Sequence, residues 1–368
     1  MKNVLNIVPY PFLPYYSGGQ KLIALFNQFL GEQCDLHVAG SFENDDALAK
    51  NYTFHSILGK KNKVRFINPA SFFKLKKLVE ENKIDTVIVE HPYLGWMGWL
   101  LKLTCKTKLI IHTHNVEHER FRTVGKWWWP FLKIYETWVL NRADFVFCIS
   151  EEDRQWMIEK MKIAAVKCIL VPYGITQQEP PIDKKECKEM VCAKHGFNPA
   201  HELFFFNGLL DYKPNTDAVK TIIEKINPAL LVKNIPYNIL IAGKRLPESF
   251  QELKAFNHQH LYYAGFVDDI DLYTKAADML LNPINSGGGV KTKMIEALGL
   301  NTTVVATATA AIGVNKQVCG DKLKIVSDND WSAFANEVLD AASTELTIPT
   351  TFYQTYYWGN IIQQIKNL

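Results

Sequence analysis

Short, continuously apolar segments alternate with longer amphipathic segments along almost the whole chain, and this alternation constrains the fold more than any other feature. A strand that is apolar on both faces belongs to a parallel sheet with helices covering both sides. The alternation runs through two successive series, so we predict an α/β protein with two Rossmann-like domains. The predicted strands are residues 4–8, 35–39, 86–90, 108–112, 145–149 and 168–171 in the first series, and 203–207, 237–242, 261–265, 279–282, 303–306 and 323–326 in the second.

The length of 368 residues agrees with this division, because a single hydrophobic core rarely serves more than about 250–300 residues. A polar stretch at 174–188 contains two adjacent prolines and is the predicted linker. Parallel sheets bind their ligands at the carboxyl ends of the strands. We therefore expect the loops after the strands to carry the functional residues and to meet in one cleft between the domains.

The loop after the predicted strand 279–282 has the sequence Ser286-Gly-Gly-Gly-Val-Lys-Thr-Lys-Met-Ile-Glu296 and leads into an amphipathic helix. Glycines let a backbone approach a ligand closely, and the N–H groups at a helix N-terminus attract anions. Lys291 and Lys293 add positive charge, whereas Glu296 would be repelled by phosphate and suits the neutral diol of a ribose. The loop therefore predicts a nucleotide site, with a solvated glycine-rich turn as the alternative. It matches neither the Walker loop nor the dinucleotide fingerprint.

Composition and charge exclude several other classes of protein. With 48% hydrophobic and 21% charged residues, the chain is typical of a globular protein, and its N-terminal apolar run is too short for a secretory signal. The seven scattered cysteines are expected to be free thiols in a reducing cytoplasm. The net charge of +3 is too small to predict nucleic-acid binding. Its positive excess lies in the first half, which would suit an anionic membrane surface.

Motifs after the predicted strands resemble those of family 4 glycosyltransferases with the GT-B fold. They occur in the order expected for that family and span nearly the whole chain. The bacterial branch that builds cell-surface glycans carries His-Asn-x-Glu and Pro-Asn-x-Asp-Ala, here His114–Glu117 and Pro214–Ala218. The matching segments are 14–19, 112–117, 148–153, 171–174, 206–215, 241–243, 265–269 and the glycine loop through Glu296.

The resemblance implies two facing Rossmann-like domains with an interdomain cleft. Residues 1–175, with a C-terminal crossing helix at 351–368, would bind the acceptor, and residues 176–350 would bind the nucleotide-sugar. It also implies retaining transfer of a hexose from a UDP- or GDP-sugar, with no cofactor and no catalytic metal. Lysines and backbone amides can stabilise charge on the leaving diphosphate in place of a metal. We expect Asp269-Ile-Asp271 to cap a helix rather than to bind an ion.

Individual roles also follow from the resemblance. His114 would contact the donor sugar, and Glu117 would orient an acceptor hydroxyl or cap a helix. Two departures from the family pattern affect the donor site: Gly288 replaces an acid that contacts the sugar, and an arginine near Gly208 is missing, which leaves Lys213 and Lys293 as phosphate ligands. The implied donor-binding residues are Gly18, Gly19, Lys213, Gly243, Phe266, Val267, Gly287, Gly288, Gly289, Lys293 and Glu296.

Two tryptophan-rich segments, 93–102 and 126–133, are flanked by lysines. Such segments suit a membrane interface, although a buried helix and loop in the first domain explain them equally well. The predicted partners are a nucleotide-sugar donor and a glycan or lipid-linked acceptor, with peripheral contact at the inner face of the plasma membrane. Two alternatives stay open at this point: a nucleotide-sugar epimerase of the same architecture, and a non-catalytic nucleotide-binding scaffold.

Overall fold

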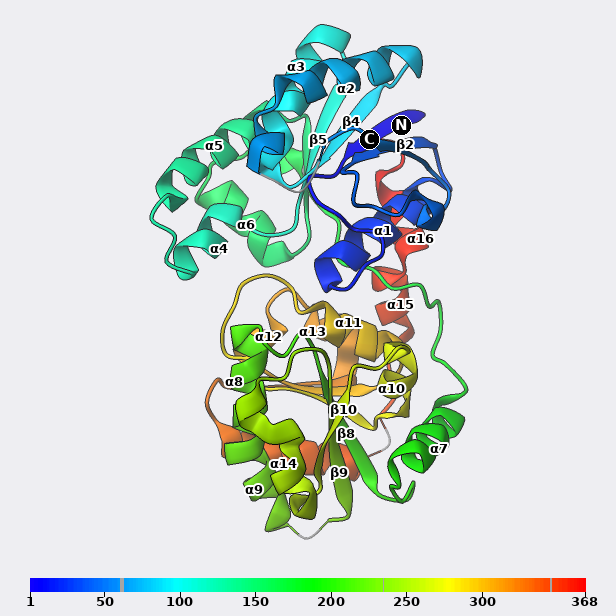
Figure 1. Ribbon diagram of the computed structural model, residues 1–368, viewed down its shortest axis with the longest axis vertical. Coiled ribbons are helices and arrows are strands. Elements are labelled where there is room, and N and C mark those ends of the chain that lie inside the picture. The colour runs from blue at the N-terminus through cyan, green and yellow to red at the C-terminus, as the bar shows by residue number, and fades with distance from the viewer. Residues whose placement is uncertain (60–62, 234, 345) are drawn as a thin grey trace. The chain divides into compact units, whose positions relative to one another are not determined.

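The computed structural model describes residues 1–59, 63–233, 235–344 and 346–368 (Figure 1). The chain divides into two compact units. Unit 1 comprises Met1–Thr176 and Tyr356–Leu368, and unit 2 comprises Gln177–Thr355. Each unit contains one parallel β-sheet with connecting helices, so the predicted α/β architecture of two Rossmann-like domains is confirmed.

The sheet of unit 1 has the strand order β3-β2-β1-β4-β5-β6-β7. The direction of chain progression therefore reverses between β1 and β4, which is where open parallel sheets bind ligands. Its strands are β1 (Asn3–Ile7), β2 (Asp35–Gly40), β3 (Thr53–Ser56), β4 (Thr86–Glu90), β5 (Lys108–Thr113), β6 (Phe145–Cys148) and β7 (Cys168–Leu170). Its helices are α1 (Gly18–Leu30), α2 (Pro69–Glu81), α3 (Gly95–Cys105), α4 (Glu117–Thr123), α5 (Trp129–Arg142), α6 (Glu151–Glu159) and α16 (Trp358–Ile365).

Helix α16 closes unit 1 by packing against α1. Trp358 is fully buried, and its ring centroid lies 6.2 Å from that of Phe26 on α1. Gly174 is needed beside it, because a Cβ at that position would lie 2.5 Å from the indole ring. The two chain ends meet here, and the Met1 amino group donates a hydrogen bond of 2.9 Å to the carbonyl of Lys366 (Figure 1).

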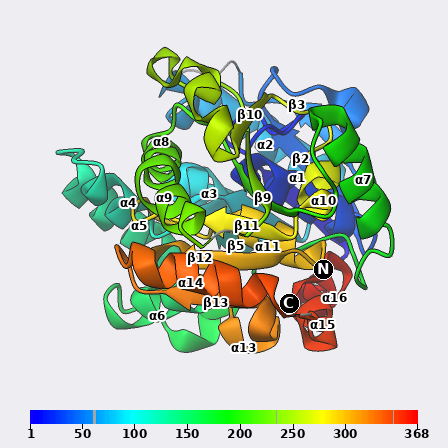
Figure 2. The same cartoon turned by 90° about the horizontal axis from the view of Figure 1, so that it is seen from below.

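Unit 2 has the strand order β10-β9-β8-β11-β12-β13, with its reversal between β8 and β11. Helix α7 packs against α10, and α9 packs against α14 (Figure 2). Its strands are β8 (Glu202–Asn207), β9 (Tyr237–Ala242), β10 (Leu261–Gly265), β11 (Met279–Asn282), β12 (Thr303–Thr307) and β13 (Leu323–Val326). Its helices are α7 (Lys184–His195), α8 (Lys213–Thr221), α9 (Asn227–Leu231), α10 (Ile270–Ala276), α11 (Thr292–Gly299), α12 (Ala308–Ala311), α13 (Lys316–Cys319), α14 (Trp331–Ala342) and α15 (Thr350–Tyr356).

The predicted strands are all present, but three details differ from the prediction. Strand β3 was missed because it is a partly exposed edge strand with no continuous apolar run. Helix α7 begins at Lys184, inside the stretch predicted as linker. The single helix predicted at 351–368 is instead two helices, α15 and α16. Tyr357 separates them with extended dihedral angles (φ −68°, ψ 124°), because it forms a β-bridge with Ile175.

Candidate active site

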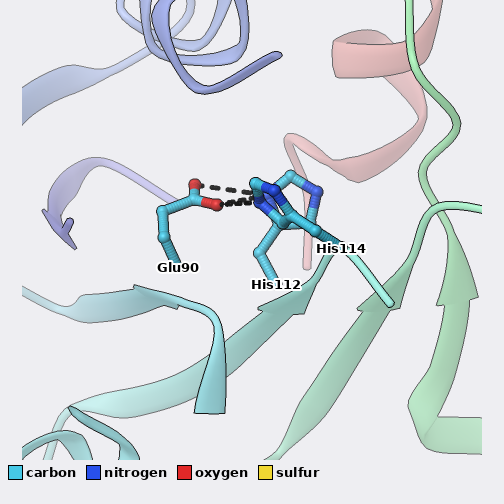
Figure 3. Close-up of side chains that lie close together, drawn as sticks. All are labelled: Glu90, His112 and His114. Carbon is cyan, nitrogen blue, oxygen red and sulfur yellow. Dashed lines mark hydrogen bonds and ion pairs between the residues drawn. The ribbon is translucent and has the colours of Figure 1, made fainter. Parts of the chain in front are cut away.

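Polar side chains gather in unit 1 at the carboxyl ends of β4 and β5, beside the reversal of strand order. Glu90 ends β4, His112 lies in β5, and His114 follows β5 directly. Figure 3 shows both imidazoles turned toward the Glu90 carboxylate. All three side chains are buried among apolar strands, although each of them is polar or charged. Because buried charges need partners, the three groups must be considered as one network.

Glu90 is an ionised carboxylate held by protein donors. His114 Nε2 lies 2.6 Å from Oε2, His112 Nδ1 lies 3.1 Å from the same oxygen, and Asn6 Nδ2 donates to Oε1 at 2.9 Å. Burial acts to raise the pKa of Glu90, but the two histidines outweigh it and hold that pKa well below the ordinary range. Glu90 was missed by the sequence analysis, although it ends a predicted strand at the ligand-binding edge.

His114 is consequently a neutral imidazole with a fixed orientation. Burial and the neighbouring His91 lower the pKa of His114 to about 3, against the opposing effect of Glu90. The short contact between Nε2 and an ionised carboxylate oxygen places the single imidazole proton on Nε2. Nδ1 therefore keeps its lone pair, and His114 is suited to accept a hydrogen bond from a sugar hydroxyl.

Glu117 begins helix α4 and its side chain is fully buried. Its carboxylate accepts hydrogen bonds from Tyr93 Oη (2.5 Å) and Arg120 Nη2 (2.6 Å), and also lies 3.0 Å from His91 Nδ1. Burial acts to raise its pKa, but these partners lower the pKa of Glu117 to about 2. We predicted that this carboxylate would either orient an acceptor hydroxyl or cap a helix. The structure shows its protein partners, and its role toward an acceptor stays a prediction.

The N-terminus of α4 is capped from a distance by Glu136 on α5. The buried carboxylate of Glu136 accepts the backbone N–H groups of Glu117 (2.9 Å) and His118 (3.0 Å). A carboxylate at a helix N-terminus satisfies unpaired donors and opposes the helix dipole. This cap fixes the first turn of α4, and therefore the position of the Glu117 side chain.

His91 was also missed by the sequence analysis. Its backbone (φ 62°, ψ 158°) lies in a region that is essentially restricted to glycine, which costs about 1–3 kcal/mol and is most often seen at functional sites. Its ring contacts Glu117 through Nδ1 and Tyr10 Oη through Nε2, at 3.0 and 2.6 Å. The ring centroid lies 4.1 Å from that of His114. A histidine placed directly after a strand at the sheet reversal was the signal that could have revealed it.

Glu90, His112 and His114 also have the composition of a metal site. One ligand atom from each lies within 4.8 Å of the others, and two imidazoles with one carboxylate can bind iron or zinc. In the observed arrangement both imidazoles point an N–H group at the carboxylate, so an ion would have to displace both protons. The absence of a catalytic metal stays a prediction.

Gly18 and Gly19 are the first two residues of α1, after the capping residue Ser17. At these positions the backbone N–H groups have no carbonyl partner within the helix. A Cβ on Gly19 would meet nothing within 4 Å, so the space beside this turn is open. Both N–H groups lie in the first turn of α1, and their contact with a ligand stays a prediction.

Lys293 lies in the first turn of α11 in unit 2, half-buried over the end of β8. Its Nζ donates to the carbonyl of Asn207 at 2.7 Å and lies 4.1 Å from the centroid of the Phe206 ring. The structure gives α11 no side-chain N-cap. The N–H of Met294 donates to the carbonyl of Lys291 at 2.9 Å, whereas those of Thr292 and Lys293 have no carbonyl partner within the helix and can bind an anion. Burial and then Lys291 lower the pKa of Lys293 to about 7.

The glycine loop folds over the side chain of Lys291. Its Nζ donates to the carbonyls of Gly287 and Gly289, both at 2.9 Å, so this lysine holds the loop instead of reaching freely for phosphate. Gly287 and Gly289 adopt positive φ angles of 85° and 76°, which favour glycine. A Cβ on Gly288 would meet nothing within 4 Å, so the position of the missing family acid is open space.

The other donor-site candidates lie at the ends of β8, β9 and β10 or on the neighbouring helices. Gly243 must be glycine, because a Cβ there would lie 1.9 Å from the carbonyl oxygen of Gly208. Phe266 is 54% exposed with Lys244 Nζ 3.9 Å from its ring centroid, whereas Val267 is buried. Glu296 is half-buried on α11, on the same face as Lys293.

Lys213 is the candidate that the structure places least favourably. Its side chain is 83% exposed, and its Nζ forms an ion pair of 2.6 Å with Asp217 one turn further along α8. Lys293 is therefore the better of the two lysines that could replace the missing arginine.

Two family models match the chain. Glycosyltransferase Family 4 matches residues 16–179, and Glycosyl transferases group 1 matches residues 201–344, so together they take in most of the sequence. The chain belongs to family 4 of the glycosyltransferases. The predicted family is confirmed, and the fold of both units agrees with it.

Two curated relatives from Escherichia coli have names that describe surface-glycan enzymes. One is the O-antigen biosynthesis glycosyltransferase WbnH, 24% identical over 195 residues, which are 52% of this chain and 54% of that protein. The other is a UDP-Gal:α-D-GlcNAc-diphosphoundecaprenol α-1,3-galactosyltransferase, 24% identical over 232 residues, or 58% of this chain and 55% of that protein. The chain thus spans about half the length of the curated relatives it matches.

Among solved structures, the Anabaena protein Alr3699/HepE in complex with UDP superposes with a TM-score of 0.73 at 14% identity. The match covers 100% of this chain and 99% of that one, which confirms the GT-B fold.

All seven cysteines are free thiols, as predicted. In the described parts of the chain, no helix combines the length and the apolar character that crossing a bilayer requires.

Proposed function

We propose that the protein is a retaining glycosyltransferase that moves a hexose from a UDP- or GDP-sugar to a glycan acceptor in the synthesis of a cell-surface polysaccharide. The named activities of the two curated relatives support this assignment. Unit 2 binds the nucleotide-sugar, and unit 1 supplies His114 to the transferred sugar and carries the acceptor site.

The observation that carries the proposal is the arrangement around Lys293. A half-buried lysine, the N-terminus of α11 without a side-chain cap, and a glycine loop with open space beside Gly288 lie together at the carboxyl end of β11. These groups attract a diphosphate and stabilise the charge that develops when it leaves. Glu296 then binds the ribose hydroxyls. Because lysine and amide groups supply the positive charge, the reaction needs no catalytic metal.

The test is calorimetric titration of UDP- and GDP-sugars, followed by an assay of nucleotide release with glycan acceptors. Lys293→Met should strongly weaken donor binding, whereas the exposed Lys225→Met serves as a matched control and should not. Proton NMR of the product should show the anomeric configuration of the donor. An inverted product would refute retention, and nucleotide release without transfer would instead indicate an epimerase.

We further propose that the acceptor is lipid-linked and that α4 and α5 dock on an anionic bilayer. Four apolar side chains here are strongly exposed: Val124, Trp127, Phe131 and Ile134, at 61, 80, 67 and 71%. Lys126 and Lys133 lie among them and are also exposed. Exposed aromatic residues beside lysines suit the interface between headgroups and acyl chains.

Only the second of the two tryptophan-rich segments supports this docking. In the first segment, Trp96 and Trp99 pack against the core of unit 1, and Trp96 Nε1 donates to the carbonyl of Phe66 at 2.8 Å. In the second, Trp128 packs on Phe121 with ring centroids 4.5 Å apart, which leaves Trp127 as the most exposed tryptophan of that segment.

Sedimentation with vesicles of phosphatidylglycerol should therefore show binding that weakens as salt is added. Trp127→Ala should reduce it several-fold without loss of folding. Ile182→Ala removes a still more exposed apolar side chain from unit 2 and should have no effect. If the protein fails to sediment with vesicles at low salt, a soluble acceptor is the better explanation.

A further inference from the structure

We propose that Tyr10 is a specificity-determining residue that accepts a hydrogen bond from a hydroxyl group of the glycan acceptor, and that His91 and Glu117 are its positioning residues. The inference rests on the proposed transferase function and assigns it a contact that the family motifs do not include. It is built on a chain of three side chains from three segments of unit 1.

The chain runs from a buried carboxylate through an imidazole to a phenol. Glu117 Oε1 lies 3.0 Å from His91 Nδ1, and His91 Nε2 lies 2.6 Å from Tyr10 Oη. Glu117 is fully buried and His91 nearly so, whereas Tyr10 is only half-buried at the carboxyl end of β1. Of the three side chains, Tyr10 therefore keeps the largest exposed fraction.

The direction of the protons follows from the carboxylate. Glu117 is ionised and can only accept, so the proton of a neutral His91 resides on Nδ1. His91 Nε2 then carries a lone pair, and the hydrogen in the 2.6 Å contact must come from Tyr10. Once Tyr10 has donated its only proton inward, its oxygen can only accept from a ligand. It therefore selects a hydrogen-bond donor such as a sugar hydroxyl.

The position of His91 is fixed from several sides. Its backbone is held in the strained conformation described above, and its N–H donates to the carbonyl of His112 at 2.9 Å. Its ring stacks on Tyr93 at 5.4 Å and 14°, and lies 4.1 Å from the ring of His114. Strain of this kind persists only where the surroundings determine the conformation and is concentrated at active sites. A conformation maintained at this cost indicates that the direction of the His91 ring matters.

The charges behind Tyr10 exclude a phosphate as its ligand. Two buried carboxylates, Glu90 and Glu117, face this region, and Arg120 supplies the guanidinium that pairs with Glu117. Burial, then Glu90 and Glu117, raise the pKa of Tyr10, against the effect of Arg120, so the phenol stays protonated. An anion would meet repulsion here, whereas a neutral hydroxyl group would not. The ligand of Tyr10 is thus a polyol part of the acceptor.

The kinetic test is Tyr10→Phe, assayed at pH 8 with a UDP-sugar donor and a short-chain GlcNAc-diphospho-lipid. We expect the KM for the acceptor to rise about tenfold, as for the loss of one hydrogen bond, with donor affinity by calorimetry unchanged within about twofold. Tyr52→Phe alters another half-buried tyrosine of unit 1 and is the matched control. A series of deoxy acceptors then identifies the hydroxyl group that Tyr10 contacts. The acceptor that lacks this hydroxyl should have the same KM with Tyr10→Phe as with the wild-type protein. A tenfold loss of donor affinity, or equal losses with every deoxy acceptor, would overturn the inference.

A second measurement does not depend on turnover, so failure of the proposed function and failure of this inference remain distinguishable. Nitrogen-15 NMR of the histidine rings at pH 8 should show His91 with its proton on Nδ1, and Tyr10→Phe should shift the Nε2 resonance. A His91 ring protonated on Nε2 would overturn the inference even if the wild-type protein transfers sugar. Absence of transfer with the expected tautomer would instead count against the proposed function.

Discussion

Above pH 7, donor binding should be accompanied by protonation of the Lys293 amino group. Burial and the charge of Lys291 lower the pKa of its ammonium group to about 7 in the free protein. A bound diphosphate supplies negative charge that raises this pKa again. Below pH 7 the lysine is already charged, and affinity should not depend on pH. Above pH 7 each binding event must first recharge the lysine, so affinity should fall as the pH rises.

The size of the effect follows from the pKa. At pH 8, roughly nine-tenths of the free protein carries a neutral Lys293, so donor binding should take up about 0.9 proton, and affinity should fall roughly eightfold between pH 6.5 and 8. A UDP-sugar is the right probe, because both of its phosphates are esters and neither titrates in this range. The window ends at pH 8 because burial lowers the pKa of Lys291 to about 8, which adds a second titration above it.

The assay is calorimetry in two buffers that differ in ionisation enthalpy, which gives the number of protons taken up. Lys293→Arg is the informative control, because a guanidinium stays charged throughout and should give no uptake and a flat affinity profile. Lys293→Met should bind weakly at every pH. If wild-type affinity does not change between pH 6.5 and 8, or if Lys293→Met still takes up a proton, Lys293 is not the phosphate ligand.

Three further predictions concern the ribose contact, the metal and the glycine turns. Glu296→Ala should weaken nucleotide binding by about 1–3 kcal/mol, because charge-assisted hydrogen bonds to the ribose are lost. If the variant binds UDP and GDP as tightly as the wild-type protein does, Glu296 does not contact the ribose. EDTA should leave transfer unchanged; activity that is lost and then restored by Mn²⁺ or Mg²⁺ would point to an ion at Glu90, His112 and His114. Gly243→Ala should lower the free energy of unfolding in urea by at least about 2 kcal/mol, since its Cβ would lie 1.9 Å from a carbonyl oxygen. Gly288→Ala should change it by less than about 0.5 kcal/mol, and similar losses for both would contradict the close approach at Gly243.

Features that depend on neighbours along the chain could be predicted from the sequence. The apolar runs located the strands, apart from the exposed edge strand β3. Local capping was equally predictable: Ser150 accepts the N–H of Asp153 at 3.1 Å, and Asp269 accepts that of Leu272 at 2.9 Å. Asn301, just after α11, adopts a left-handed conformation with φ of 57°, which asparagine tolerates at a helix end. These outcomes follow from backbone sterics and hydrogen bonds that reach only a few residues.

The family motifs also located the glycine loop and His114, but they did not reveal what holds these groups. Whether Lys291 reaches for a ligand or folds back onto the loop carbonyls depends on how the loop closes, and the structure shows that it folds back. Likewise, only packing distinguishes the partly buried Trp96 from the exposed Trp127. The two tryptophans belong to similar segments, so composition could not separate them.

The electrostatics of the unit 1 site were decided by tertiary structure alone. Tyr10 and His91 are 81 residues apart, and Glu90 and His114 are 24 apart. They meet because the register of the parallel sheet brings the ends of β1, β4 and β5 to one edge. A sequence pattern shows that each residue follows a strand, but the position of a proton depends on which carboxylate lies within 3 Å. That distance is set by strand pairing and by the remote cap from Glu136. The local sequence therefore determines that each residue follows a strand, whereas the fold decides its protonation.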